Sequence, residues 1–132
     1  MRYLGIDYGS KRIGLALSDP EGKIAIPYLT ITNTKNAISD IIKIAKNENV
    51  IKIVIGLPIS FSGGESKQAI EVKKFADGIK KATTLPVGFE NEVLTTKLAK
   101  KEGILQKHLD KAAAAIILQS YLDKQKTLNP NS

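Results

Sequence analysis

A run of β-branched residues in the middle of the chain constrains the fold more than any other feature. Residues 50–57 are all Val, Ile or Leu except for one lysine and one glycine, and the run ends at Pro58. A nearly continuous apolar strand is typical of the centre of a parallel sheet, where helices cover both faces. The run therefore predicts an α/β fold.

The periodicity of the surrounding segments defines the rest of the sheet. Three strands joined by short connections come first, which favours an antiparallel meander, and Asp19-Pro-Glu-Gly22 supplies a turn between the second and third. The expected strands are 2–8, 12–18, 23–31, 50–57 and 85–90, and the expected helices are 37–47, 66–81, 95–101 and 110–124. We predict a mixed five-stranded sheet, a three-strand antiparallel meander followed by β-α-β-α, with helices on both faces and right-handed crossovers.

Composition limits the available chemistry. The 132 residues suit one domain, and no apolar run approaches the roughly 20 residues of a membrane span, so we expect a soluble, cytoplasmic protein without membrane contact. With no cysteine and a single histidine, His108, a thiolate site is excluded and a zinc site lacks ligands. The net charge of +7 favours a polyanionic partner such as nucleic acid, although lysine-rich helices that only keep a small protein soluble give the same charge.

Asp7 is an acid in a place where a strand does not favour one. It lies in an apolar run between glycines, and Lys11 and Arg12 follow at once. Ligands of α/β sheets bind beyond the carboxyl ends of the parallel strands, where the strand order switches direction, and Asp7 lies at such an end. We therefore expect a site there, with a turn-capping acid as the alternative.

Two later acids are candidates for the same site. Glu92 follows the strand 85–90 and emerges on the same edge, unless it is a solvated acid near a helix start. Asp110 opens the last helix, where it is either an N-cap or a residue delivered to the strand ends by the small alanines behind it. Three carboxylates suit Mg²⁺ or Mn²⁺, and two such ions about 4 Å apart support phosphodiester cleavage. Lys11 and Arg12 would then meet phosphates, or be exposed charges.

Two further features carry weaker signals. His108 is a candidate general base, but a lone histidine in a lysine-rich connection more often lies on the surface. The segment 60–64, with Ser60, Ser62, Gly63 and Gly64, could cradle a phosphate, but it lacks a Walker lysine, which favours a flexible loop.

Several motifs, in order along nearly the whole chain, resemble the YqgF family, also called RuvX. They are Gly5-Ile-Asp-Tyr-Gly9, Arg12-Ile-Gly14, Ile55-Gly-Leu-Pro58, Leu94-Thr-Thr96 and the segment 112–123. The family is described as Holliday-junction resolvases and pre-16S ribosomal RNA processing nucleases with a ribonuclease H-like fold. The resemblance implies a nuclease domain over 1–126, with 127–132 as a flexible tail, and metal-ligating catalytic residues at Asp7, Glu92 and Asp110.

The sequence also departs from the family pattern. Asn91 and Val93 stand where the family usually has Asp and Arg, and the connection 100–107 is shorter and less basic than usual. These changes favour a second hypothesis, a nucleic-acid-binding or assembly factor with a residual site. A third is an actin-like ATPase fragment, since Asp-x-Gly-Ser is common in such phosphate loops, although the chain has no room for the second domain. The choice between RNA and DNA, and between monomer and homodimer, stays open.

Overall fold

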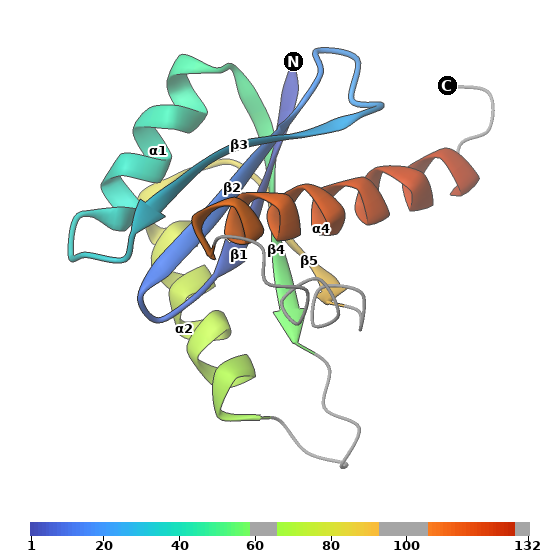
Figure 1. Cartoon of the computed structure of the whole chain (residues 1–132). Coiled ribbons are helices and arrows are strands. Elements are labelled where there is room, and N and C mark those ends of the chain that lie inside the picture. Colours follow the sequence, from blue (N-terminus) through green and yellow to red (C-terminus); the bar gives the residue numbers. More distant parts are fainter. Residues whose placement is uncertain (59–65, 93–105, 129–132) are drawn as a thin grey trace.

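The computed structural model describes residues 1–58, 66–92 and 106–128, which form one sheet covered by helices on both faces (Figure 1). The strand order is β3-β2-β1-β4-β5. The strands are β1 (Arg2–Tyr8), β2 (Arg12–Ser18), β3 (Ala25–Thr32), β4 (Val50–Pro58) and β5 (Val87–Glu92), and the helices are α1 (Ala37–Asn47), α2 (Lys67–Ala82) and α4 (Gln106–Leu128).

Pairing directions confirm the predicted mixed sheet. The strand β1 pairs antiparallel with β2 and parallel with β4, while β2–β3 is antiparallel and β4–β5 is parallel. The predicted turn is also confirmed: the Asp19 carboxylate accepts backbone N–H groups of Lys23 and Ile24, and Gly22 takes a positive φ of 71°. Because β1 has an antiparallel neighbour on one side and a parallel neighbour on the other, it lies where the sheet changes from antiparallel to parallel.

The most consequential differences from the predicted boundaries concern β5 and α4. The strand β5 runs over residues 87–92 rather than 85–90, because Pro86 has no N–H to donate and the ladder begins after it. Glu92 is consequently the last residue of the strand, not part of a following loop. The helix α4 begins at Gln106 rather than Asp110 and continues to Leu128, two residues into the expected tail. The expected helix 95–101 lies outside the described residues.

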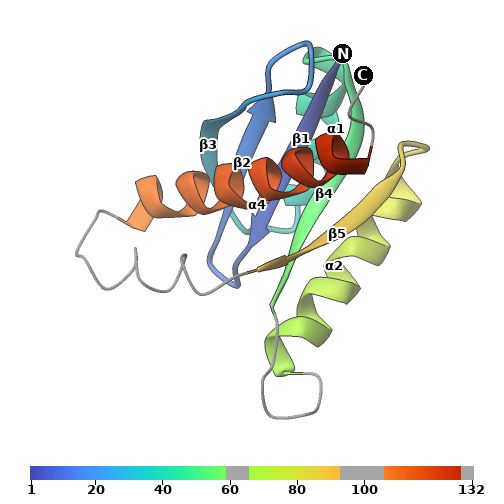
Figure 2. The same ribbon diagram turned by 90° about the vertical axis from the view of Figure 1, so that its right-hand side faces the viewer.

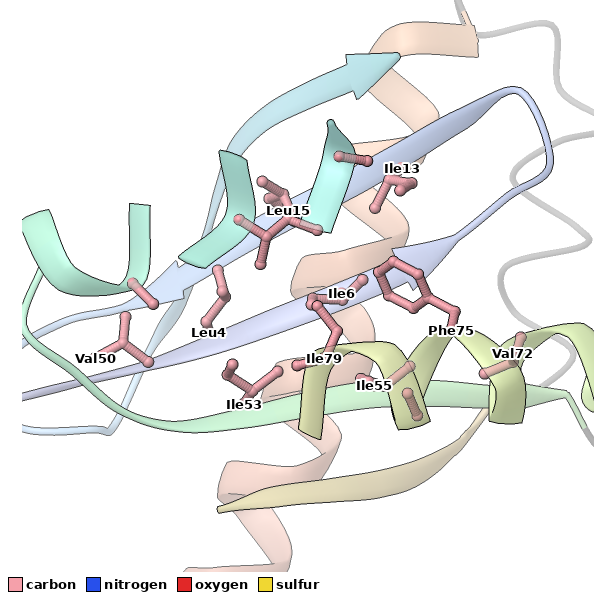
Figure 3. Close-up of a cluster of buried hydrophobic side chains, with 14 of the residues drawn as sticks. Leu4, Ile6, Ile13, Leu15, Val50, Ile53, Ile55, Val72, Phe75 and Ile79 are labelled. Carbon is pink, nitrogen blue, oxygen red and sulfur yellow. The ribbon is translucent and has the colours of Figure 1, made fainter. Parts of the chain in front are cut away.

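The two faces of the sheet carry different cores. Leu4 and Ile6 of β1 belong to the larger core, which includes residues of α1 and α2 such as Ile41 and Ile79 (Figure 3). The helix α4 crosses the strands on the opposite face (Figure 2). Because strand side chains alternate between faces, Gly5 and Asp7 belong to the α4 face.

Glycines on the α4 face let this helix approach the sheet closely. A Cβ atom at Gly5 would lie 2.7 Å from Cβ of Leu118, and one at Gly56 would lie 2.4 Å from Cδ1 of Ile117. Ile117 Cδ1 is the end of a flexible side chain and can move, but a Cβ atom at Gly5 would also lie 2.9 Å from the Ala114 carbonyl oxygen, so Gly5 sets the close separation between sheet and helix. Within the described part of the chain, no helix is long and apolar enough to cross a bilayer.

Candidate functional site

The structure brings Asp7 and Asp110 together through Gly14. Asp7 of β1 lies directly opposite Gly14 of β2, at the roughly 5 Å separation of paired antiparallel residues. The backbone of Asp110 rests on the same glycine, since a Cβ atom there would lie 1.8 Å from the Asp110 carbonyl oxygen. Both acids are buried, with 7% of each residue exposed. Asp7 and Asp110, predicted from the two ends of the sequence, therefore both adjoin Gly14.

Asp110 occupies a different place in its helix from the one predicted. It is the fifth residue of α4, not the residue that opens it. An N-cap uses its side chain to accept N–H groups of the first turn, and that function belongs to the residue before a helix. The N-cap alternative for Asp110 is therefore wrong, and the closely packed helix brings the Asp110 backbone onto Gly14, opposite Asp7.

Arg12 forms an ion pair with the second acid. Its Nε donates to Oδ2 of Asp110 at 3.0 Å, and its side chain remains 41% exposed. One end of the guanidinium thus orients a buried carboxylate while the group still reaches solvent. Lys11 is exposed on the hairpin between β1 and β2, whose carbonyl groups at Gly9 and Lys11 accept hydrogen bonds from Asn33.

Glu92 is placed by its backbone at the same end of the sheet. It ends β5, opposite Pro58 of β4, two strands away from β1 in the strand order. Neighbouring strands lie about 4.8 Å apart, so the β1 and β5 backbones are separated by about 10 Å across the sheet. Asn91, the residue that replaces the usual acid, is exposed beside it.

The chemistry of the donor set fits a hard divalent cation. Asp7 and Asp110 offer carboxylate oxygens, the ligands that Mg²⁺ and Mn²⁺ prefer. Neighbouring carboxylates repel each other, and a cation between them relieves that repulsion. Among the described side chains, which include Asp7 and Asp110 but not Glu92, no three acidic, histidine or cysteine groups are clustered as a metal site.

Glu90 is a buried acid that sequence reasoning missed. Only 4% of it is exposed, and its Oε2 accepts a hydrogen bond from Nζ of Lys124 at 2.6 Å and from Oγ of Ser120 at 3.2 Å. Both partners belong to α4, so the pair fastens the helix to β5 two residues before Glu92. Alternation in β5 could have assigned Glu90 to the α4 face, but its partners lie 30 and 34 positions further along the chain.

The remaining candidates are distributed as follows. His108 lies in the first turns of α4 and is exposed, which agrees with the surface alternative. It lines an open groove together with Lys111 and residues of β3. The serine and glycine segment 60–64, Val93 and most of the connection 100–107 lie outside the described residues.

The matching family model and two similar curated proteins all point to one family. The family model "RuvX: Holliday junction resolvase" matches residues 1–124. A protein of Rickettsia typhi named "Putative pre-16S rRNA nuclease" is 44% identical, over 96% of this chain and 87% of the relative. A protein of Chloroflexus aurantiacus with the same name is 36% identical, over 97% and 90% of the two chains.

Solved structures confirm the ribonuclease H-like fold. RuvC of T. thermophilus in complex with a Holliday junction substrate aligns with a TM-score of 0.62 at 14% identity, covering 95% of this chain and 96% of that one. The Fowlpox virus resolvase in complex with Holliday junction DNA aligns with a TM-score of 0.60 at 14% identity, covering 95% and 99%. At such identities the likeness concerns the fold alone.

Proposed function

Because the chain belongs to the RuvX family of nucleases, we propose that it is a metal-dependent endonuclease that hydrolyses phosphodiester bonds in structured nucleic acid. The precursor of 16S ribosomal RNA is the substrate we favour, since relatives at 36–44% identity are named for it. A four-way DNA junction is the second substrate, suggested by the name of the family model.

The observation that carries this proposal is the buried pair of Asp7 and Asp110. Both acids are buried, and both adjoin Gly14 at the carboxyl end of a strand where the sheet changes direction. That end is where α/β sheets bind their ligands. Arg12 beside the pair supplies a planar donor suited to phosphate.

Three residues, Asp7, Asp110 and Glu92, would hold the metal. The proposal includes two ions, either Mg²⁺ or Mn²⁺. When bound, such ions activate a water molecule and stabilise the leaving oxygen of a phosphodiester. Arg12 holds the Asp110 carboxylate in one orientation through its Nε–H. Its terminal N–H groups, together with Lys11, would bind the phosphate oxygens of the substrate strand.

The test combines metal binding with cleavage. We expect Mn²⁺ titrated by calorimetry to bind the wild-type chain and not the Asp7→Asn variant, which keeps the size of the side chain and removes its charge. The same variant should lose cleavage of precursor 16S RNA and of four-way junctions. Asp77→Asn, at an exposed position on α2, is the matched control and should change neither. Undiminished cleavage by Asp7→Asn would refute the proposed site.

A second function is favoured by Asn91. This exposed residue stands next to Glu92 and lacks the charge that the family usually carries there, which lowers the negative potential for a cation. A nucleic-acid-binding assembly factor would bind precursor RNA tightly in the presence of a chelator and would cleave nothing with Mn²⁺. A nuclease shows cleavage that depends on the metal, so the two functions give opposite results in one experiment.

A further inference from the structure

A groove lies between the edge strand β3 and the first turns of α4. Its volume is about 200 Å³, and it is lined by Tyr28, Leu29 and Thr30 of β3 and by His108 and Lys111 of α4. Among the strands that the structure describes, β3 pairs only with β2, so the groove lies along an edge of this sheet. Lys111 has no part in the site described above.

The groove lies near the acidic pair, with β2 between them. Thr30 lies opposite Gly14, and Gly14 in turn lies opposite Asp7 and beneath the backbone of Asp110. Lys111 is the next residue after Asp110 in the helix. Two strand spacings separate β3 from β1, a distance of about 10 Å. A strand of nucleic acid held at the acidic pair would therefore meet the groove as its next contact on this side.

The charges of the groove suit a phosphate. His108 is exposed and Lys111 is half-buried, and within the described part of the chain neither forms an ion pair. Two further basic residues, Arg12 and Lys11, lie next to the end of β3, where Arg12 pairs with Thr32 and the Lys11 carbonyl accepts from Asn33. Buried carboxylates repel a polyanion, so a nuclease needs cations beside its acids to hold the strand that it cuts.

We propose that this groove binds a backbone phosphate next to the one that is cleaved, with Lys111 supplying the charge and His108 supplying a ring N–H. The assignment rests on the proposed function for the identity of the polyanion. Phosphate contacts position a nucleic acid without reading its sequence, so the groove would fix the register of the scissile bond relative to Asp7 and Asp110.

Binding measured without divalent metal tests the groove separately from catalysis. Fluorescence anisotropy in a chelating buffer would follow a labelled four-way DNA junction and a labelled precursor 16S RNA stem. The variants are Lys111→Ala, Lys111→Gln as a longer uncharged replacement in case the first does not fold, and His108→Ala. Lys43→Ala, at an exposed position of α1 on the opposite face, is the control of equal charge.

We expect each Lys111 variant to bind the junction about fivefold more weakly at about 0.15 M salt, and the slope of log K against log salt to fall by about 0.9, the value for one lost phosphate contact. His108→Ala should weaken binding with little change of slope. The groove assignment fails if Lys111 variants match Lys43→Ala in affinity and slope, or if the wild-type chain binds neither nucleic acid. Binding that depends on Lys111 without any cleavage would refute the nuclease and not the groove.

Discussion

Replacing Gly14 with alanine should separate the two buried acids without changing either. A Cβ atom at position 14 would lie 1.8 Å from the carbonyl oxygen of Asp110 and 2.2 Å from its carbonyl carbon. Both are backbone atoms and cannot rotate aside. An ordinary contact is 3.4 Å, so the Asp110 carbonyl oxygen, now 1.8 Å from the new Cβ position, must move away by about 1.6 Å together with the start of α4.

The size of this shift sets the expected losses. Overpacking a close interface costs about 1–3 kcal/mol of unfolding free energy, whereas alanine in a strand otherwise gains about 0.5–1 kcal/mol over glycine. A displacement of about 1 Å in a catalytic group can lower activity about 100-fold. We therefore expect Gly14→Ala to unfold at lower urea concentration, by about 1–2 kcal/mol, and to lose most Mn²⁺ binding and cleavage.

Gly88→Ala is the matched control for this experiment. The new Cβ atom would lie 3.4 Å from Cε of Lys52, the far end of a flexible side chain. This variant should gain about 0.5–1 kcal/mol of stability and keep the metal binding and cleavage of the wild-type chain. If Gly14→Ala behaves like Gly88→Ala in urea titration and in Mn²⁺ calorimetry, the contact between β2 and α4 does not set the geometry of the site, and the reasoning is wrong.

Two further predictions concern pairs outside the acidic site. Lys124→Met should lower the free energy of unfolding, measured in urea, by about 1–3 kcal/mol, because it leaves the buried Glu90 carboxylate without its cation. Adding Glu90→Gln should recover part of this loss. Purely additive effects of the two substitutions would contradict the prediction. The pKa of Asp19 is lowered from 3.8 by the N–H groups of Ile24 and Lys23, so its ionised form stabilises the fold above about that pH, and this stability disappears as the pH falls through the lower folded value. The stability that Asp19→Asn loses should therefore be largest near neutral pH and shrink below pH 3.8. An equal loss of stability at neutral pH and below pH 3.8 in thermal unfolding would exclude the mechanism.

Local patterns were sufficient to predict most of the sheet. The run ending at Pro58 and the turn at Asp19 each depend on neighbours within a few residues, and the structure confirms both. The errors occurred where one residue type has two uses. Asp110 has the side chain of a good N-cap, but helix-forming residues precede it and the helix begins four residues earlier. The start of β5 was predicted two residues too early, because Pro86 has no backbone N–H to donate to the neighbouring strand.

The candidate site was predictable only in part. Asp7 could be identified because an acid among apolar residues contradicts the strand that contains it. The ion pair of Arg12 with Asp110 joins residues 98 positions apart, and no periodicity within either segment specifies such a contact. Glu90 was missed for the same reason, because its burial depends on partners in α4 that the strand sequence does not reveal.

The two ion pairs together suggest how three separate elements would hold the proposed site. Asp7 belongs to the sheet, Asp110 to α4 and Glu92 to the end of β5, so their spacing depends on how the helix lies on the sheet. The pair of Arg12 with Asp110 fastens one end of α4 to β2, and the pair of Lys124 with Glu90 fastens the other end to β5. A helix held at one end only can pivot, whereas a helix held at both ends cannot. The Glu90–Lys124 pair, which lies outside the proposed set of metal ligands, would therefore help to fix the distance between the acids that two-ion hydrolysis requires.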